Sequence, residues 1–135
     1  MSEKPALSVL VVEDESEIRR ALSTYAEKRG FVCTAVGDGR QALELGLQHH
    51  YDVILLDISL PSLDGHQVLK GLTEKRAVDE TVVLFLTAHD TQLDRRVGLE
   101  LGADDYETKP VHLATLFSKI EWLLEKRRLR SGGGA

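Results

Sequence analysis

Short apolar runs, each ending at a polar or charged residue, are the most constraining feature of this chain. Residues 7–12, 53–56 and 82–86 are almost entirely apolar, and they are followed by Glu13, Asp57 and Thr87. Such a run predicts a strand buried on both faces, because a strand with one face in water would alternate apolar and polar residues. Strands of this kind belong to parallel sheets covered by helices on both sides.

Amphipathic helical patterns separate these strands. Apolar side chains recur at three- and four-residue spacing in five segments: 18–26, 42–47, 68–72, 93–101 and 113–124. Weaker strand patterns lie at 31–36 and 102–109, and Asp38-Gly39 and Asp64-Gly65 mark turns. Five strands alternating with five helices predict an α/β fold, a doubly wound five-stranded parallel sheet in a three-layer sandwich.

Composition indicates one globular domain. The chain has 135 residues, of which 42% are hydrophobic and 29% charged. Its single cysteine, Cys33, excludes an internal disulfide and favours a cytoplasmic location, and no apolar run reaches the roughly 20 residues of a membrane span. The net charge of −5 argues against non-specific nucleic-acid binding. The last helix is expected to end near Arg130, leaving 131–135 as a flexible glycine-rich tail or the start of a linker.

The polar residues at the strand ends predict a functional site, because ligands of doubly wound sheets bind beyond the carboxyl ends of the strands. Glu13, Asp14 and Asp57 bring three carboxylates to that edge, and such a cluster needs a cation. Ligation by oxygen alone suits Mg²⁺, with Mn²⁺ as the alternative. Thr87 and Lys109 suit phosphoryl oxygens, and a carboxylate such as Asp57 can attack phosphorus to form an acyl phosphate.

Each of these residues taken alone has an ordinary structural interpretation. Asp57 can cap a turn, Thr87 can cap a helix, and Lys109 can be solvated. Glu13 and Asp14 can complement a helix dipole. Their combination at successive strand ends favours the phosphoryl-transfer site. Four of the five histidines, His49, His50, His66 and His112, receive no functional role.

The chain resembles the receiver domains of two-component response regulators from Leu7 to about Arg128. The motifs that carry the resemblance are Glu13-Asp14, the segment 57–65, Leu86-Thr87-Ala88, the segment 102–106, and Lys109-Pro110 with its typically cis proline. The resemblance implies a flavodoxin-like sheet of strand order 2-1-3-4-5 and a receiver domain over residues 1–130.

By this resemblance the chain is a phosphorylation-controlled switch. Asp57 would accept a phosphoryl group from a phosphohistidine on a sensor histidine kinase or a histidine phosphotransfer protein. The domain would catalyse only its own phosphorylation and dephosphorylation, so it is not an enzyme for outside substrates. Asp14, Asp57 and the backbone carbonyl of Ser59 would bind Mg²⁺, with Glu13 acting largely through water.

The resemblance also implies how the signal leaves the site. Thr87 and Lys109 would hold the phosphoryl group, Thr87 would move toward it, and Tyr106 would turn inward behind it. The changed surface, made by the fourth helix, last strand and last helix, would contact an output domain or target protein. No direct nucleic-acid binding and no membrane contact are expected. Ser59 and His89 resemble positions that tune acyl-phosphate lifetime.

Three other functions are weighed against this one. An aspartate-nucleophile phosphatase of the haloacid dehalogenase type would carry a second aspartate where this chain has Ser59. A flavin- or nucleotide-binding domain would need a phosphate cradle where Glu13 and Asp14 stand. A receiver-like interaction module that is never phosphorylated would not need the complete set of site residues.

Overall fold

The computed structural model describes residues 6–88 and 92–132. Within them lie the five expected strands: β1 (Ser8–Val12), β2 (Val32–Val36), β3 (Val53–Asp57), β4 (Val82–Thr87) and β5 (Asp105–Thr108). All neighbouring strands pair in parallel, in the order β2-β1-β3-β4-β5. This confirms the doubly wound sheet with order 2-1-3-4-5.

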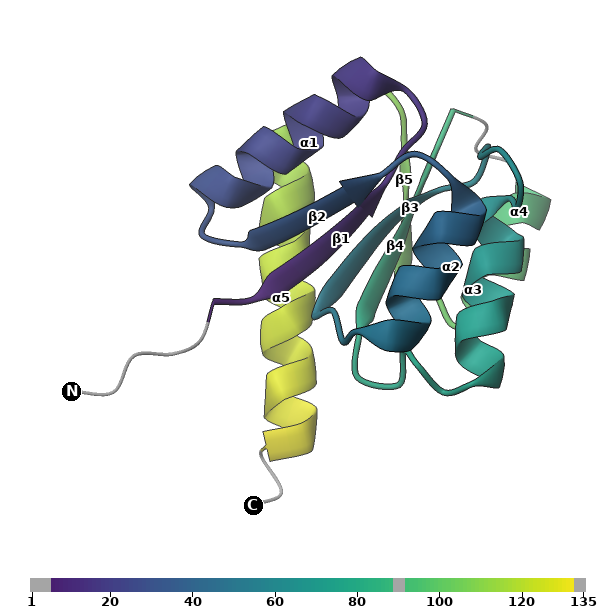
Figure 1. Cartoon of the computed structure of the whole chain (residues 1–135). Helices are drawn as coiled ribbons and strands as arrows, with labels where there is room; N and C mark the ends of the chain where they lie inside the picture. Colours follow the sequence, from purple (N-terminus) through teal and green to yellow (C-terminus); the bar gives the residue numbers. More distant parts are fainter. Residues whose placement is uncertain (1–5, 89–91, 133–135) are drawn as a thin grey trace.

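Helices cover both faces of the sheet. They are α1 (Ser16–Lys28), α2 (Gly39–Gln48), α3 (Gly65–Glu74), α4 (Gln92–Glu100) and α5 (Leu113–Gly132). Figure 1 shows α1 and α5 on one face and α2, α3 and α4 on the other. None of these described helices has a stretch both long and apolar enough to cross a membrane.

The last helix is longer than the sequence predicts. It was expected to end near Arg130, but it continues to Gly132. A glycine costs a helix only about 1 kcal/mol relative to alanine, so a 20-residue helix can extend over one at its end. The rest of the expected tail, 133–135, lies outside the described residues, and so does His89.

Two apolar clusters hold the layers together, one on each side of the sheet. On β1, Leu10 and Val12 face the α2–α3 side, whereas Val9 and Val11 face the α1–α5 side. The three central strands are buried on both faces, as expected. The edge strand β2 differs, because it is only partly buried and its Val32 is 60% exposed.

Helix caps in the sequence set where α2 and α3 begin. The Asp38 side chain accepts hydrogen bonds from the first backbone N–H groups of α2. At α3, Asp64 and Gln67 form a reciprocal capping box, so both orphan N–H groups are satisfied. The cap of α2 ends the loop after β2, and the cap of α3 ends the loop after β3. The loop after β3 directly follows Asp57.

Candidate functional site

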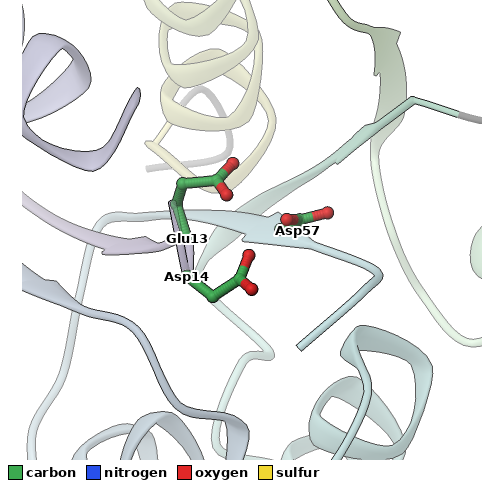
Figure 2. Close-up of side chains that lie close together, drawn as sticks. All are labelled: Glu13, Asp14 and Asp57. Atoms are coloured by element: carbon green, nitrogen blue, oxygen red, sulfur yellow. The ribbon is translucent and has the colours of Figure 1, made fainter. Parts of the chain in front are cut away.

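The fold brings the predicted residues to one edge of the sheet. Glu13 and Asp14 follow β1, Asp57 ends β3, Thr87 ends β4 and Lys109 follows β5. Parallel strands end at the same edge, so residues far apart in sequence become neighbours. Figure 2 shows the carboxylates of Glu13, Asp14 and Asp57 close together at this edge.

Three carboxylates form the acidic part of the site. One oxygen atom from each of Glu13, Asp14 and Asp57 lies within 4.8 Å of the other two. Glu13 and Asp57 are buried and Asp14 is exposed, so the cluster opens to solvent on the Asp14 side. Oxygen-only donors, accessible to water on one side, fit a hydrated divalent cation such as Mg²⁺.

Lys109 is the cation that the described structure places in this cluster. Its Nζ atom lies 2.5 Å from Oε1 of Glu13 and 3.1 Å from Oδ2 of Asp57. The lysine therefore bridges two carboxylates that would otherwise repel each other. Burial lowers the pKa of Lys109, but the hydrogen bonds and negative charges of Glu13 and Asp57 outweigh that effect and raise the pKa overall.

Burial removes the Glu13 carboxylate from water, which makes its charged form unfavourable. Burial raises the pKa of its carboxyl from 4.5 to about 7, although the hydrogen bonds from Lys109 and from the backbone of Glu15 lower it. The negative charge of Asp57 contributes to this increase in the pKa. Glu13 Oε2 accepts a hydrogen bond from Glu15 N at 3.1 Å, and Oε1 forms the ion pair with Lys109. The expectation that Glu13 reaches a metal through water stays a prediction.

The backbone around Asp57 fixes the orientation of its side chain. The N–H of Ser59 donates to Oδ1 of Asp57 at 3.2 Å, while Lys109 donates to Oδ2. Helix α3 begins close behind, and a Cβ at Gly65 would lie only 2.4 Å from the carbonyl oxygen of Asp57. Glycine is therefore required at this contact. The role of the Ser59 carbonyl as a metal ligand stays a prediction.

Arg19 supports the acidic pair and was missed by the sequence reasoning. One guanidinium nitrogen donates to the backbone carbonyls of Glu13, at 2.8 Å, and Asp14, at 3.2 Å. Arg19 thus fixes the loop that carries both carboxylates without occupying the metal-facing side of either. A basic residue in the first turns of α1, shortly after an acidic pair, is the signal that could have indicated it.

Thr87 and Tyr106 lie on neighbouring strands behind the acidic cluster. Thr87 is 3% exposed, and its carbonyl accepts a hydrogen bond from Lys109 N at 2.7 Å. Tyr106 is 2% exposed and pairs with Phe85 in the β4–β5 register. The tyrosine is therefore already inside the molecule here, and its predicted movement stays a prediction. The Lys109-Pro110 peptide bond is cis, as the resemblance implied.

The family of the chain follows from comparison with known proteins. The family described as the response regulator receiver domain matches residues 9–121, which include every predicted site residue. The chain belongs to this family. The receiver domain is the phosphorylation-controlled part of two-component response regulators, so the fold and the class of function predicted from the sequence are confirmed.

Named relatives and solved structures agree with the assignment. The receiver domain is 41% identical over 128 residues to the sensory transduction protein RegX3 of Mycolicibacterium smegmatis, covering 95% of this chain and 55% of that protein. It is 39% identical to the transcriptional activator protein PfeR of Pseudomonas aeruginosa, covering 93% of this chain and 40% of that protein. The chain thus spans about half the length of these relatives.

Two solved receiver domains have the same fold. The receiver domain of the Francisella response regulator 1452 superposes with a TM-score of 0.82 at 35% identity, covering 89% of this chain and 98% of that one. The receiver domain of the sensor histidine kinase PA1611 of Pseudomonas aeruginosa gives 0.81 at 29% identity, covering 90% and 99%. That second structure holds a magnesium ion in its active-site cleft.

Proposed function

We propose that Asp57 accepts a phosphoryl group from a phosphohistidine of a sensor histidine kinase or a histidine phosphotransfer protein. The observation that carries the proposal is the bridge of Lys109 between Glu13 and Asp57 inside a three-carboxylate cluster. In the step, a carboxylate oxygen of Asp57 bonds to phosphorus while the phosphorus–nitrogen bond breaks. The electron pair of that bond stays on the histidine, and an acyl phosphate forms.

The site residues prepare this transfer in distinct ways. Ser59 N–H and Lys109 hold the two oxygens of Asp57, so the nucleophile is oriented before the donor arrives. Lys109 can follow the negative charge from the carboxylate to the phosphoryl oxygens, because its Nζ atom lies only 3.1 Å from Asp57. The Thr87 hydroxyl, at the end of the adjacent strand, is the proposed donor to another phosphoryl oxygen.

Mg²⁺ is the proposed cofactor, with Mn²⁺ as a substitute. Asp14, Asp57 and the Ser59 carbonyl would hold it, and Glu13 would contribute through water. When bound, the metal supplies positive charge that neutralises the phosphoryl oxygens. The magnesium ion in the PA1611 receiver domain supports the choice of metal.

The proposed output is a change at the surface of α4, β5 and α5. Thr87 would move toward the phosphoryl group, with Tyr106 turned inward behind it. Leu93 of α4 is 68% exposed and Trp122 of α5 is 59% exposed, which supports a protein-binding surface there. The chain would act only on its own phosphoryl group, catalysing its phosphorylation and dephosphorylation. A cytoplasmic location, with neither nucleic acid nor membrane bound directly, completes the proposal.

A phosphorylation assay tests the proposal. The chain is incubated with Mg²⁺ and a small phosphodonor such as acetyl phosphate, and hydroxylamine-labile phosphate is measured. Asp57→Asn should abolish it, because an amide cannot form the acyl phosphate. Asp79→Asn is the matched control, since Asp79 precedes β4 at the opposite edge of the sheet and pairs only with Arg76 through its described side-chain contacts. Equal labelling of the two variants would contradict the proposal.

A further inference from the structure

His66, in the first turn of α3, contacts the buried Tyr106 of β5. Its Nε2 atom lies 3.0 Å from the tyrosine hydroxyl oxygen, and that hydroxyl donates a hydrogen bond to the backbone carbonyl of Asp94 in α4. Since the hydroxyl proton goes to Asp94, Nε2 of His66 must be the donor to the tyrosine oxygen. Both the neutral Nε2–H tautomer and the imidazolium can donate, so the contact does not depend on the charge of His66.

Aromatic packing holds the same two side chains together. Both rings pack against Phe85 of β4. The ring centre of Tyr106 lies 5.2 Å from that of Phe85, and the ring centre of His66 lies 5.1 Å from that of Phe85 in an edge-to-face arrangement. The Arg95 guanidinium carbon lies 5.7 Å from the centre of the Tyr106 ring. Tyr106 is therefore enclosed from α3, β4 and α4 at once.

Gly98 of α4 provides the space that the tyrosine occupies. A Cβ at this position would lie 2.5 Å from Cε2 of Tyr106 and 3.0 Å from Cδ2 of Phe85. Side chains do not approach that closely, so any larger residue would force the ring or the helix to move. The described contacts of the buried tyrosine thus include a hydrogen bond from His66 and the space left by the absent side chain of Gly98.

We propose that His66 is a positioning residue that holds Tyr106 inward before phosphorylation. The inference rests on the proposed function and concerns the unphosphorylated chain. His66 follows the loop that begins at Asp57, and Tyr106 lies three residues before Lys109 on the chain. The hydrogen bonds from His66 to Tyr106 and from Tyr106 to Asp94 therefore connect the segments that carry the site to α4, part of the proposed output surface.

A quantitative consequence follows from linkage. If the phosphorylated site favours the inward tyrosine, a chain that already holds it inward binds a phosphoryl analogue more tightly. A single hydrogen bond corresponds to about a 2- to 10-fold change in such an equilibrium. Removing the His66 donor should weaken binding of the analogue by this factor, and restoring a donor should reverse the loss.

Fluorotyrosine labelling of the full chain follows the tyrosine directly. The chain has three tyrosines, so its ¹⁹F spectrum is simple, and Tyr106→Phe assigns the signal. His66→Leu removes the donor at similar size, whereas His66→Gln keeps an N–H donor at the equivalent position. Gly98→Ala fills the space beside the Tyr106 ring without altering His66, so its spectrum shows where the fluorine signal of a displaced Tyr106 appears. The solvent-isotope shift of the Tyr106 signal should increase in His66→Leu and Gly98→Ala but not in His66→Gln.

Affinity for beryllofluoride, measured with Mg²⁺ present, is the second readout. His66→Leu should weaken it about 2- to 10-fold, and His66→Gln should not. In a Tyr106→Phe background, which lacks the accepting oxygen, His66→Leu should have no further effect. A merely structural role for His66 would give the same loss in both backgrounds.

The outcomes separate the two proposals. An unchanged Tyr106 signal in His66→Leu overturns the positioning role, and so does a moved signal with unchanged beryllofluoride affinity. A wild-type chain that binds no beryllofluoride and forms no acyl phosphate contradicts the proposed function instead. In that case the fluorine spectra still decide whether His66 holds Tyr106.

Discussion

The ammonium group of Lys109 lies 2.5 Å from Oε1 of Glu13, whose side chain has no exposed surface. The two residues are 96 positions apart and follow β1 and β5, which are separated in the sheet by β3 and β4. An ion pair between them forms only while both partners are charged, and burial makes the charged form of Glu13 costly, so the folded chain favours the protonated carboxyl. The charge state of Glu13 therefore makes the ion pair dependent on pH.

Stability of the metal-free chain should fall as pH rises from about 4.5 to about 7. The pKa of Glu13 is raised to about 7 in the folded chain from 4.5, so between these values the folded state binds a proton that the unfolded state has lost. Stability from this group is full below pH 4.5 and is lost as pH rises toward 7, by at most about 3 kcal/mol. Urea unfolding in the presence of a chelator measures it.

The control for this pH dependence is Glu13→Gln, which cannot titrate. Its stability curve should lack the decline between pH 4.5 and 7, so the difference between the two curves isolates Glu13. A wild-type stability that is flat or rises across this window would contradict the raised pKa.

Lys109→Met should slow phosphorylation by small phosphodonors about 100-fold or more, because a preorganised charge at the transferring group is lost. Lys119→Met is the matched control. Lys119 is also partly buried between two carboxylates, Asp105 and Glu107, but it lies on α5 outside the site. Initial rates of acyl-phosphate formation at saturating Mg²⁺ compare the two, and similar rates would remove Lys109 from the transfer step.

Much of this site was predictable because strand ends are visible in sequence. The apolar run 53–56 predicts a buried strand, and the position of Asp57 directly after it predicts the edge at which ligands bind. Thr87 follows the same rule. The structure adds the pairing itself, since nothing in the sequence indicates that Lys109 contacts Glu13 and Asp57 at the same time.

Other features depend on tertiary contacts that no local pattern carries. Arg19 and His66 look like ordinary residues of amphipathic helices, and their roles come from a backbone carbonyl and a tyrosine that the fold brings to them. In the sequence, Gly98 is only a residue that destabilises a helix, and its packing against the ring of Tyr106 becomes visible in the structure. The end of α5 was predicted too early because local glycine signals ignore the length of the helix that precedes them.

Asp14→Asn should weaken Mg²⁺ binding at least 10-fold, because it removes the exposed carboxylate of the cluster. The neighbouring Glu15→Gln is the control, since Glu15 is also exposed and acidic but its side chain lies outside the cluster. Titration calorimetry with Mg²⁺ measures both. Equal losses would mean that only the overall negative charge attracts the metal.

Arg19→Met should weaken Mg²⁺ binding about 10-fold while the fold persists. The methionine keeps the apolar stem but loses the hydrogen bonds to the carbonyls of Glu13 and Asp14, so the loop that aims the carboxylates becomes mobile. Residues that orient metal ligands typically contribute about 10- to 100-fold to affinity. By simple charge, removing a cation should strengthen binding, so a loss of affinity separates positioning from electrostatics. Arg20→Met, one residue along on the exposed side of α1, should show only the small electrostatic gain. Tighter Mg²⁺ binding by both variants would show that Arg19 acts through charge alone.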